Sequence, residues 1–173
     1  MATGSLIKIA ETTVSSATAS VTLTGIDSTY DVYKVQLVNV VTETDARGLN
    51  FRFTVSGSAD TSSNYDRAFR NFRGDSAFTD INYENQSVLD LGTIGTGTQE
   101  IANATQYLFN FNNASEYSFT TIEGSFRNND SHLRGFQGGG VLTVAQATDG
   151  VSYFMSNSDN IASGVFTLFG LKK

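Results

Sequence analysis

Apolar and polar side chains alternate with a period of two along much of this chain. The clearest run is Leu49, Phe51, Phe53 and Val55, which alternate with Asn50, Arg52 and Thr54. Similar runs are Ala19 to Leu23, Tyr33 to Leu37, and Tyr107, Phe109 and Phe111, the last alternating with Gln106 and Asn110. Successive side chains of a strand point to opposite faces. Each run therefore predicts an antiparallel strand with its apolar face on a core and its polar face in water.

Further segments are rich in strand-forming residues and are separated by the turn formers Gly, Asn, Asp and Ser. They cover residues 6–10, 65–72, 78–83, 117–126, 140–145, 152–155 and 164–171. No stretch has an apolar stripe at helical spacing, so we expect at most one helical turn, at 88–91 or 103–106. About ten short strands at this spacing predict an all-β, antiparallel β-sandwich with jelly-roll or Greek-key wiring. Residues 1–173 show no linker and no repeat, which predicts a single domain.

Composition and charge narrow the classes of function. The net charge is −6 and only 16% of the residues are charged, with no block of Lys or Arg. Such an acidic surface repels phosphates, so we expect no nucleic-acid partner. The absence of cysteine excludes disulfides and thiolate metal ligands. The N-terminus lacks the pattern of a secretory signal, and no apolar run approaches the ~20 residues that span a bilayer. We therefore expect a protein made in a cytoplasm, without a membrane partner.

Side chains that could carry catalysis are scattered. His132 is the only histidine, and its neighbours Asp130 and Ser131 cannot form a triad with it, because triad members converge from separate elements. The acidic residues follow no D-x-D-x-D-G pattern, so no metal or other cofactor is predicted. A carboxylate pair suited to glycoside hydrolysis stays open, because the sequence does not show which carboxylates meet. We expect no enzymatic activity.

A basic segment stands out in this acidic chain. Residues 65–73 place Arg67, Arg70 and Arg73 among aromatic residues, and Arg134 and Phe136 precede three glycines, Gly138 to Gly140. Arg and aromatic side chains are enriched at protein interfaces, so these five Arg and Phe residues are the interface candidates. An ordinary strand that exposes its arginines to water fits the same segment equally well. The glycines fit either a mobile loop or bulge, or a contact loop that bends to fit a partner.

Two parts of the chain resemble a group of small tailed-bacteriophage virion proteins. One is the ending, residues 149–173, where a polar turn Ser-Asp-Asn-Ile-Ala-Ser-Gly, close to the group's pattern Ser-x-x-Asn-Ile-Ala-Ser-Gly, precedes a strand Phe-Thr-Leu-Phe-Gly-Leu. The other is the opening, with residues 17–23, 30–41 and 49–57. Together these parts cover about half of the chain, whereas the middle, with its arginines, matches loosely. The resemblance implies a virion component with a jelly-roll-like sandwich, assembled as a homotrimer.

These observations predict a non-enzymatic decoration or cement protein on the exterior of a phage head, where an acidic surface avoids packaged DNA. Its partners would be its own copies and the major capsid protein or another virion protein. The alternative is a tail-fibre or receptor-binding module that holds a host surface glycan on exposed aromatic residues, with Tyr30, Tyr83 and Tyr153 as candidates. A third reading is a free carbohydrate-binding or hydrolytic β-sandwich.

Overall fold

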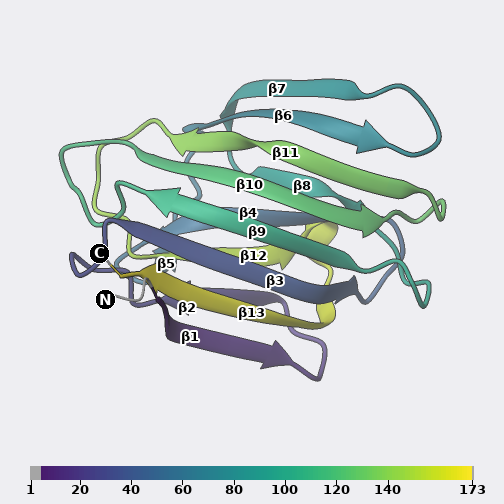
Figure 1. Ribbon diagram of the computed structural model, residues 1–173, viewed down its shortest axis with the longest axis horizontal. Coiled ribbons are helices and arrows are strands. Elements are labelled where there is room, and N and C mark those ends of the chain that lie inside the picture. Colours follow the sequence, from purple (N-terminus) through teal and green to yellow (C-terminus); the bar gives the residue numbers. More distant parts are fainter. Residues whose placement is uncertain (1–4, 173) are drawn as a thin grey trace.

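The computed structural model describes residues 5–172, which form two antiparallel sheets packed face to face (Figure 1). Residues 1–4 and Lys173 lie outside the described residues. Residues 1–4 begin the N-terminal segment that lacks the pattern of a secretory signal. The one helical element in the described range is a short 3-10 turn, Ser156–Ser158. No helix in that range is long and apolar enough to cross a membrane.

The larger sheet has eight strands in the order β1-β13-β3-β9-β10-β11-β6-β7. Their bounds are β1 Leu6–Val14, β13 Ile161–Leu171, β3 Val32–Thr42, β9 Ala102–Phe109, β10 Ser118–Arg127, β11 Leu133–Leu142, β6 Tyr65–Arg73 and β7 Thr79–Gln86. The smaller sheet has the order β2-β12-β4-β5, and β8 also pairs with β4. Its bounds are β2 Ser20–Thr24, β12 Gly150–Met155, β4 Arg47–Val55, β5 Ser58–Ala59 and β8 Leu89–Ile94.

Eight of the strands are wired as a jelly roll. The set β1-β13-β3-β9 lies in the larger sheet and the set β2-β12-β4-β8 in the smaller one. The chain crosses between the sheets from β1 to β2, from β2 to β3 and from β3 to β4, and its last two strands insert between earlier ones. This alternation is the double Greek key of a jelly roll. The predicted all-β sandwich is confirmed, and we call these eight strands the jelly-roll core.

Four more strands extend the larger sheet beyond β9. The pair β6 and β7 is inserted between β4 and β8, and the pair β10 and β11 between β9 and β12. We call these four strands the wing; they occupy the upper part of Figure 1. The side chain of Leu89 on β8 lies beneath Gly140 of β11, and Arg67 of β6 reaches Asp90 on β8. The edge strand β7 has no buried residue. The wing therefore rests on β8 and overhangs the smaller sheet.

The hydrophobic core lies between the inner faces of the two sheets. Val35 and Leu37 of β3 and Phe166 and Leu168 of β13 face it from the larger sheet, each almost fully buried. Phe51 and Phe53 of β4, Val151 and Tyr153 of β12 and Leu23 of β2 face it from the smaller sheet. The period-two runs at 19–23, 33–37 and 49–55 thus turn their apolar residues inward as predicted, except that Ala19, just before β2, is exposed and Val55 is half-buried. The predicted wet polar face is wrong on β4, where Asn50 and Thr54 are buried and the Thr54 hydroxyl donates to Asp149. Two facing layers of branched and aromatic side chains are the arrangement that stabilises a sandwich.

The inward face of β9 was predicted wrongly. Tyr107 and Phe109 lie on the outer face and are half-buried, whereas Ala102, Ala104, Gln106 and Leu108 face the core. Gln106 is accepted there because its amide is satisfied: the Tyr153 hydroxyl donates to its Oε1, and its Nε2 donates to the Thr120 hydroxyl at 3.0 Å. A buried polar group with hydrogen-bond partners on both sides costs little. The expected helical turns at 88–91 and 103–106 are also wrong, because these residues lie mainly in β8 and β9.

The three consecutive glycines are part of a strand and form no loop. Gly138, Gly139 and Gly140 pair in regular register with β10 on one side and β6 on the other. A Cβ atom on Gly138 would lie 2.2 Å from the Ala68 carbonyl oxygen, and one on Gly140 would lie 2.8 Å from Leu89. The expectation of a close backbone approach holds, and the expectations of a mobile loop or a bending contact loop are wrong. Because glycine has no side chain, the outer surface of β11 is also low at this point.

Candidate binding surface

The predicted interface arginines are all engaged within the chain. Arg70, on the outer face of β6, donates from Nε and Nη2 to the two carboxylate oxygens of Asp80 at 2.6 and 2.8 Å. Arg67 points to the inner face, where its Nη1 donates to the Asp90 carbonyl at 3.1 Å and its guanidinium lies 5.0 Å from the Tyr83 ring centroid. These contacts tie the wing to itself and to β8. A role of these arginines at an interface remains a prediction.

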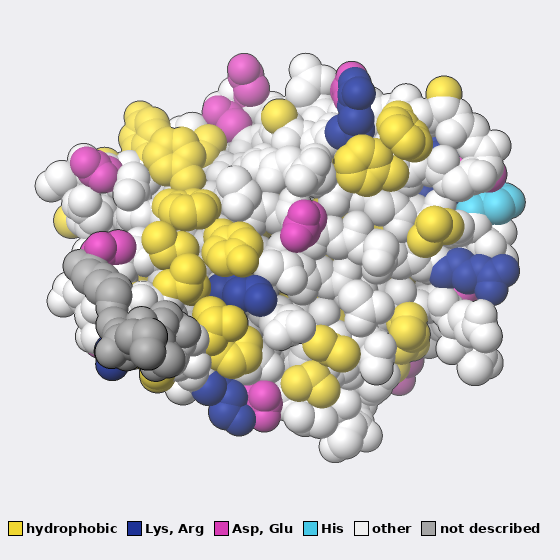
Figure 2. All heavy atoms as spheres, viewed as in Figure 1, with side chains coloured by type: hydrophobic (Ala, Val, Ile, Leu, Met, Phe, Trp, Pro, Cys, Tyr) yellow, Lys and Arg dark blue, Asp and Glu magenta, His cyan; other side chains and the backbone are white. Residues whose placement is uncertain are grey.

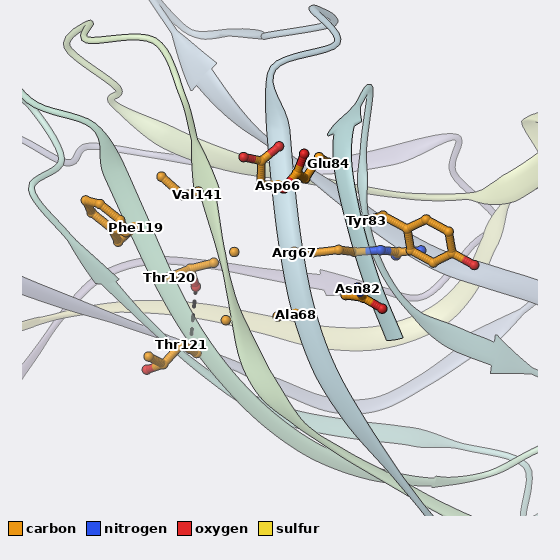
Figure 3. A pocket seen from close by; sticks show the side chains of 12 residues that line it. Asp66, Arg67, Ala68, Asn82, Tyr83, Glu84, Phe119, Thr120, Thr121 and Val141 are labelled. Atoms are coloured by element: carbon orange, nitrogen blue, oxygen red, sulfur yellow. Dashed lines mark hydrogen bonds between the residues drawn. The ribbon is translucent and has the colours of Figure 1, made fainter. Parts of the chain in front are cut away.

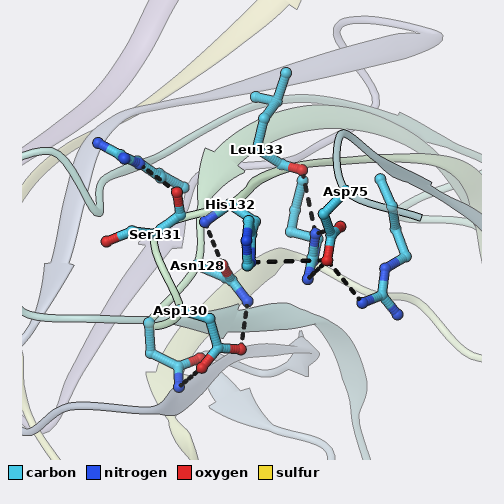
Figure 4. A network of polar contacts seen from close by, with 10 residues as sticks. Asp75, Asn128, Asp130, Ser131, His132 and Leu133 are labelled. Atoms are coloured by element: carbon cyan, nitrogen blue, oxygen red, sulfur yellow. Dashed lines mark hydrogen bonds and ion pairs between the residues drawn. The ribbon is translucent and has the colours of Figure 1, made fainter.

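Asp75 gathers the remaining basic side chains at the end of the wing (Figure 4). Arg134 donates to both of its oxygens, Arg73 Nη2 lies 3.4 Å from Oδ2, and His132 Nδ1 lies 3.7 Å from the same oxygen. The hydrogen bonds from Arg134, more than any other contact, hold the pKa of the Asp75 carboxyl well below its usual range. Arg73 and Arg134, neighbours on β6 and β11, are thus held together by one carboxylate.

Phe136, the fifth interface candidate, belongs to the core. Its side chain is only 5% exposed and packs against Phe69 and Phe126, with ring centroids 6.4 and 6.1 Å away. It lies on the inner face of β11, on the same face as Arg134. The side chain is therefore not available at the surface, and the aromatic pattern of this segment reflects packing.

The neighbours of His132 do not converge on it. The Ser131 hydroxyl donates to Glu100 at 3.0 Å, and Asp130 accepts a hydrogen bond from Asn128, while His132 faces Asp75 (Figure 4). Between residues 5 and 172, no group of three His, Cys, Asp or Glu side chains is placed to hold a metal ion. These contacts join the loop between β10 and β11 to Asp75 and Glu100, so the network has a structural role.

A groove of about 790 Å³ runs along the outer face of the wing (Figure 3). Its floor is low because Gly139 and Ala68, paired across β11 and β6, have almost no side chain. One wall is apolar, with Phe119 and Val141, which also pair directly. The other carries the polar side chains of Asn82, Glu84 and Asp66, and Figure 3 shows Asp66 and Glu84 next to each other. The groove thus presents an apolar side and an acidic side to a ligand.

An apolar row continues from this groove across the larger sheet. Its members are Val141 on β11, Phe119 on β10, Phe109 on β9, Val32 on β3, Leu171 on β13 and Leu6 on β1. Phe119 is 43% exposed and Leu6 48%. Figure 2 shows the corresponding hydrophobic band along one end of this face, with Lys or Arg side chains within and below it. A contiguous exposed apolar band of this kind marks an interaction surface more often than chance.

The tyrosines expected to hold a glycan are placed differently from one another. Tyr153 is fully buried, so the expectation that it forms an exposed platform is wrong. Tyr30 is half-buried and packs edge-on against Tyr33. Tyr83 is 51% exposed, but it pairs in register with Arg67 and stacks on it at the inner face of the wing, so its ring points away from the groove. The exposed aromatic ring inside the groove is Phe119, which sequence reasoning missed because its alternation with polar residues also fits an inward position.

Comparison with known proteins adds little to the geometry. No protein-family model matches the chain, and no curated protein matches it. Among solved structures, the chain is similar to the CBM2 module of the evolved Dit of Lactobacillus casei BL23 phage J-1. The identity is 12%, the TM-score is 0.25, and the match covers 89% of this chain and 70% of that module. A TM-score this low does not establish a shared fold, so the likeness carries no functional argument.

Proposed function

We propose that the protein is a non-enzymatic structural component of a tailed-phage virion that decorates or cements the exterior of the head. The observation that carries the proposal is the exposed apolar row across the larger sheet, which is suited to burial against another protein. The virion context comes from the resemblance of residues 149–173 and of the opening segments, which supply β2, β3, β4, β12 and β13 of the jelly-roll core.

A protein of this kind acts through shape and buried area. Apolar surface removed from water contributes roughly 25 cal/mol per Å², so a row of six exposed or half-exposed apolar side chains can hold neighbouring subunits together without any chemistry. Jelly rolls occur in viral capsid domains and in lectin domains, an analogy at the level of the fold that is compatible with this role. The net charge of −6 favours the outside of the head, away from packaged DNA. The trimer implied by the resemblance remains a prediction.

Copy number and head stability test this proposal. Intact particles are imaged by cryo-EM, and the protein is counted by quantitative mass spectrometry against the major capsid protein. We expect many symmetric copies on the head exterior, and heads that lack the protein should release DNA at a lower temperature than complete heads. Location inside the head, or a few copies at the tail with unchanged heat resistance of the head, would contradict the proposal.

A second candidate is an appendage module that binds a host surface glycan, and the groove on the wing favours it. Ligand sites combine an apolar lining with a few polar groups, here Phe119 on one wall of the groove and Asn82 and Glu84 on the other, an arrangement that suits a sugar chain laid across the floor. Binding of purified host-surface polysaccharide should be lost in Asn82→Ala and retained in Thr24→Ala, a matched change on the outer face of the smaller sheet. Equal binding by both variants would remove the groove from consideration.

A further inference from the structure

The outer face of the larger sheet has two unlike halves. On the core half, Phe109, Val32, Phe169 and Leu171 form an apolar ridge across β9, β3 and β13. On the wing half, Gly139 and Ala68 form the low floor of the groove, between Phe119 and Glu84. At the end of the face that carries the apolar row, one half therefore projects where the other is hollow, and a second hollow of about 640 Å³ crosses β3, β9, β10 and β11 at the other end.

Charge follows the same division. Lys8 and Lys34 lie on the core half, on either side of Phe169, with which each of them pairs in register. Asp66 and Glu84 lie at the acidic wall of the groove on the wing half. Lys8 is 3.2 Å from Glu11 on its own strand, and Arg70 and Asp80 of the wing neutralise each other. The core half thus carries Lys8 and Lys34 against one carboxylate, Glu11, whereas the groove wall carries two carboxylates, Asp66 and Glu84.

We infer that this face binds a second copy of the same chain, related by a twofold axis that lies in the interface and runs parallel to the strands. The sheet has eight strands, and β9 and β10 are its two central ones. An axis between them places the ridge of each copy over the groove of the other, and it brings β1 opposite β7 and β3 opposite β11. Such an isologous contact uses the same patch twice and closes on itself.

The reversed orientation is the one that satisfies both shape and charge. Two copies stacked without reversal would place ridge on ridge, lysine near lysine, and Asp66 and Glu84 near their counterparts. With reversal, the ridge fills the hollow above Gly139 and Ala68, and Lys8 and Lys34 approach the carboxylates of the other copy. Opposite charges across an interface set its register and suppress wrong arrangements, because juxtaposed like charges are costly.

The available area is sufficient for a specific contact. Eight strands at 4.8 Å spacing span about 34 Å, and six residues along a strand span about 20 Å, so roughly 700 Å² per copy could be buried. Stable interfaces bury ~800 Å² per partner. The inference does not depend on a place in a virion. A threefold contact elsewhere on the surface would be additional and would give six copies in all.

Mass measurement on the purified chain tests the inference. Sedimentation velocity from about 1 to 100 µM should show an even number of copies, with a mass that halves in Phe119→Asp, from two copies to one or from six to three. Phe119 is exposed, so this variant should fold, which its circular dichroism spectrum and thermal unfolding check. The control Thr24→Asp, which adds the same charge to the outer face of the smaller sheet, should leave the mass unchanged.

Charge reversal separates a second copy from any other occupant. Lys8→Glu and Glu84→Lys should each weaken association about tenfold, and the double variant should recover most of the loss, because each reversed side chain meets the other one across the axis. Absence of recovery would overturn the twofold arrangement. A chain that stays monomeric at 100 µM would also overturn it, and the apolar row would then be expected to bind a capsid subunit. An unchanged mass in Phe119→Asp would overturn it as well.

Discussion

The jelly-roll core and the wing share one continuous sheet but are stabilised in different ways. In the core, β4, β12 and β13 carry long runs of buried residues, and most of their inward side chains are branched, aromatic or long apolar groups. In the wing, β7 has no buried residue and β11 contains three glycines in succession. Ion pairs from Arg67, Arg70 and Arg134 hold the wing where packing is thin.

This difference indicates that the jelly-roll core specifies the fold, whereas the outer face of the wing can vary with function. The segments that resemble phage virion proteins fall mostly on core strands, whereas the loosely matching middle of the chain supplies the wing and its groove. The outward positions of inserted strands can change without loss of such a framework, whereas the inward residues of the wing, such as Phe69, Phe126 and Phe136, are part of the shared core. We therefore expect the binding surface to lie on the wing and on the face that the wing shares with β9, β3 and β13.

The strongest way to test the contrast is to remove a core ring. Phe53 is fully buried and lies within 6.1 Å of the rings of Phe51, Tyr65 and Phe111. We expect Phe53→Ala to lower the free energy of unfolding by about 3–5 kcal/mol, because it removes apolar burial and leaves a cavity. Phe119→Ala on the outer face should change it by less than ~0.5 kcal/mol. Urea unfolding of the two variants, analysed below the concentration of self-association, measures both; equal losses would contradict the assignment of inner and outer faces.

A smaller effect is expected where the core meets the wing. The Tyr153 hydroxyl of β12 donates to Gln106 of β9, and Gln106 donates to Thr120 of β10. Tyr153→Phe leaves the Gln106 carbonyl oxygen buried without this donor, which should cost about 1–3 kcal/mol in urea unfolding. The double variant with Gln106→Leu should recover part of the loss, since it removes the unsatisfied oxygen. A double variant with the full sum of the single losses would show that no coupling exists.

The smallest effect is expected in the wing, and it depends on pH. Because its pKa is depressed in the folded state, the Asp75 carboxyl stabilises the protein above its unfolded pKa of about 4, and this contribution is lost as pH falls below that value. We expect the urea midpoint of Asp75→Asn to fall less than that of the unaltered protein between pH 5 and pH 2.5. Asp66→Asn serves as the control, because the Asp66 carboxylate, near the other end of β6, accepts a single backbone hydrogen bond from Asn85 and contacts no arginine. Identical pH profiles for Asp75→Asn and the unaltered protein would contradict the role of the network.

Much of the fold follows from the alternation of residue types. The runs in β2, β3 and β4 name their buried residues correctly, since a one-residue shift would have turned Phe51 and Phe53 into water. The same reasoning failed at β9, because Tyr107 and Phe109 are apolar enough for the core and Gln106 is acceptable there only with partners from β12 and β10. Those partners are 14 and 47 residues away in sequence, so no local pattern indicates them.

Less of the candidate surface could be predicted from the sequence. The arginines of β6 stand out in the sequence, but it does not show that they pair with Asp75, Asp80 and Asp90, because pairing depends on strand order. The groove arises from Gly139 and Ala68 meeting across two strands that are far apart in sequence. Triple glycine is the one local signal for it, and because strands seldom contain three glycines, the sequence alone favours a loop or a bulge there.

The position of β13 has a consequence for how the protein is made. β1 has β13 as its sheet neighbour, and β13 lies between β1 and β3. While a ribosome is still translating residues 161–171, the strand that completes this part of the sheet does not exist, and β1 and β3 leave a gap one strand wide. Closure of the domain must then wait for release of those residues, and such long-range pairing is slow. A nascent chain arrested before Ile161 would expose open strand edges, which makes it a natural substrate for chaperones.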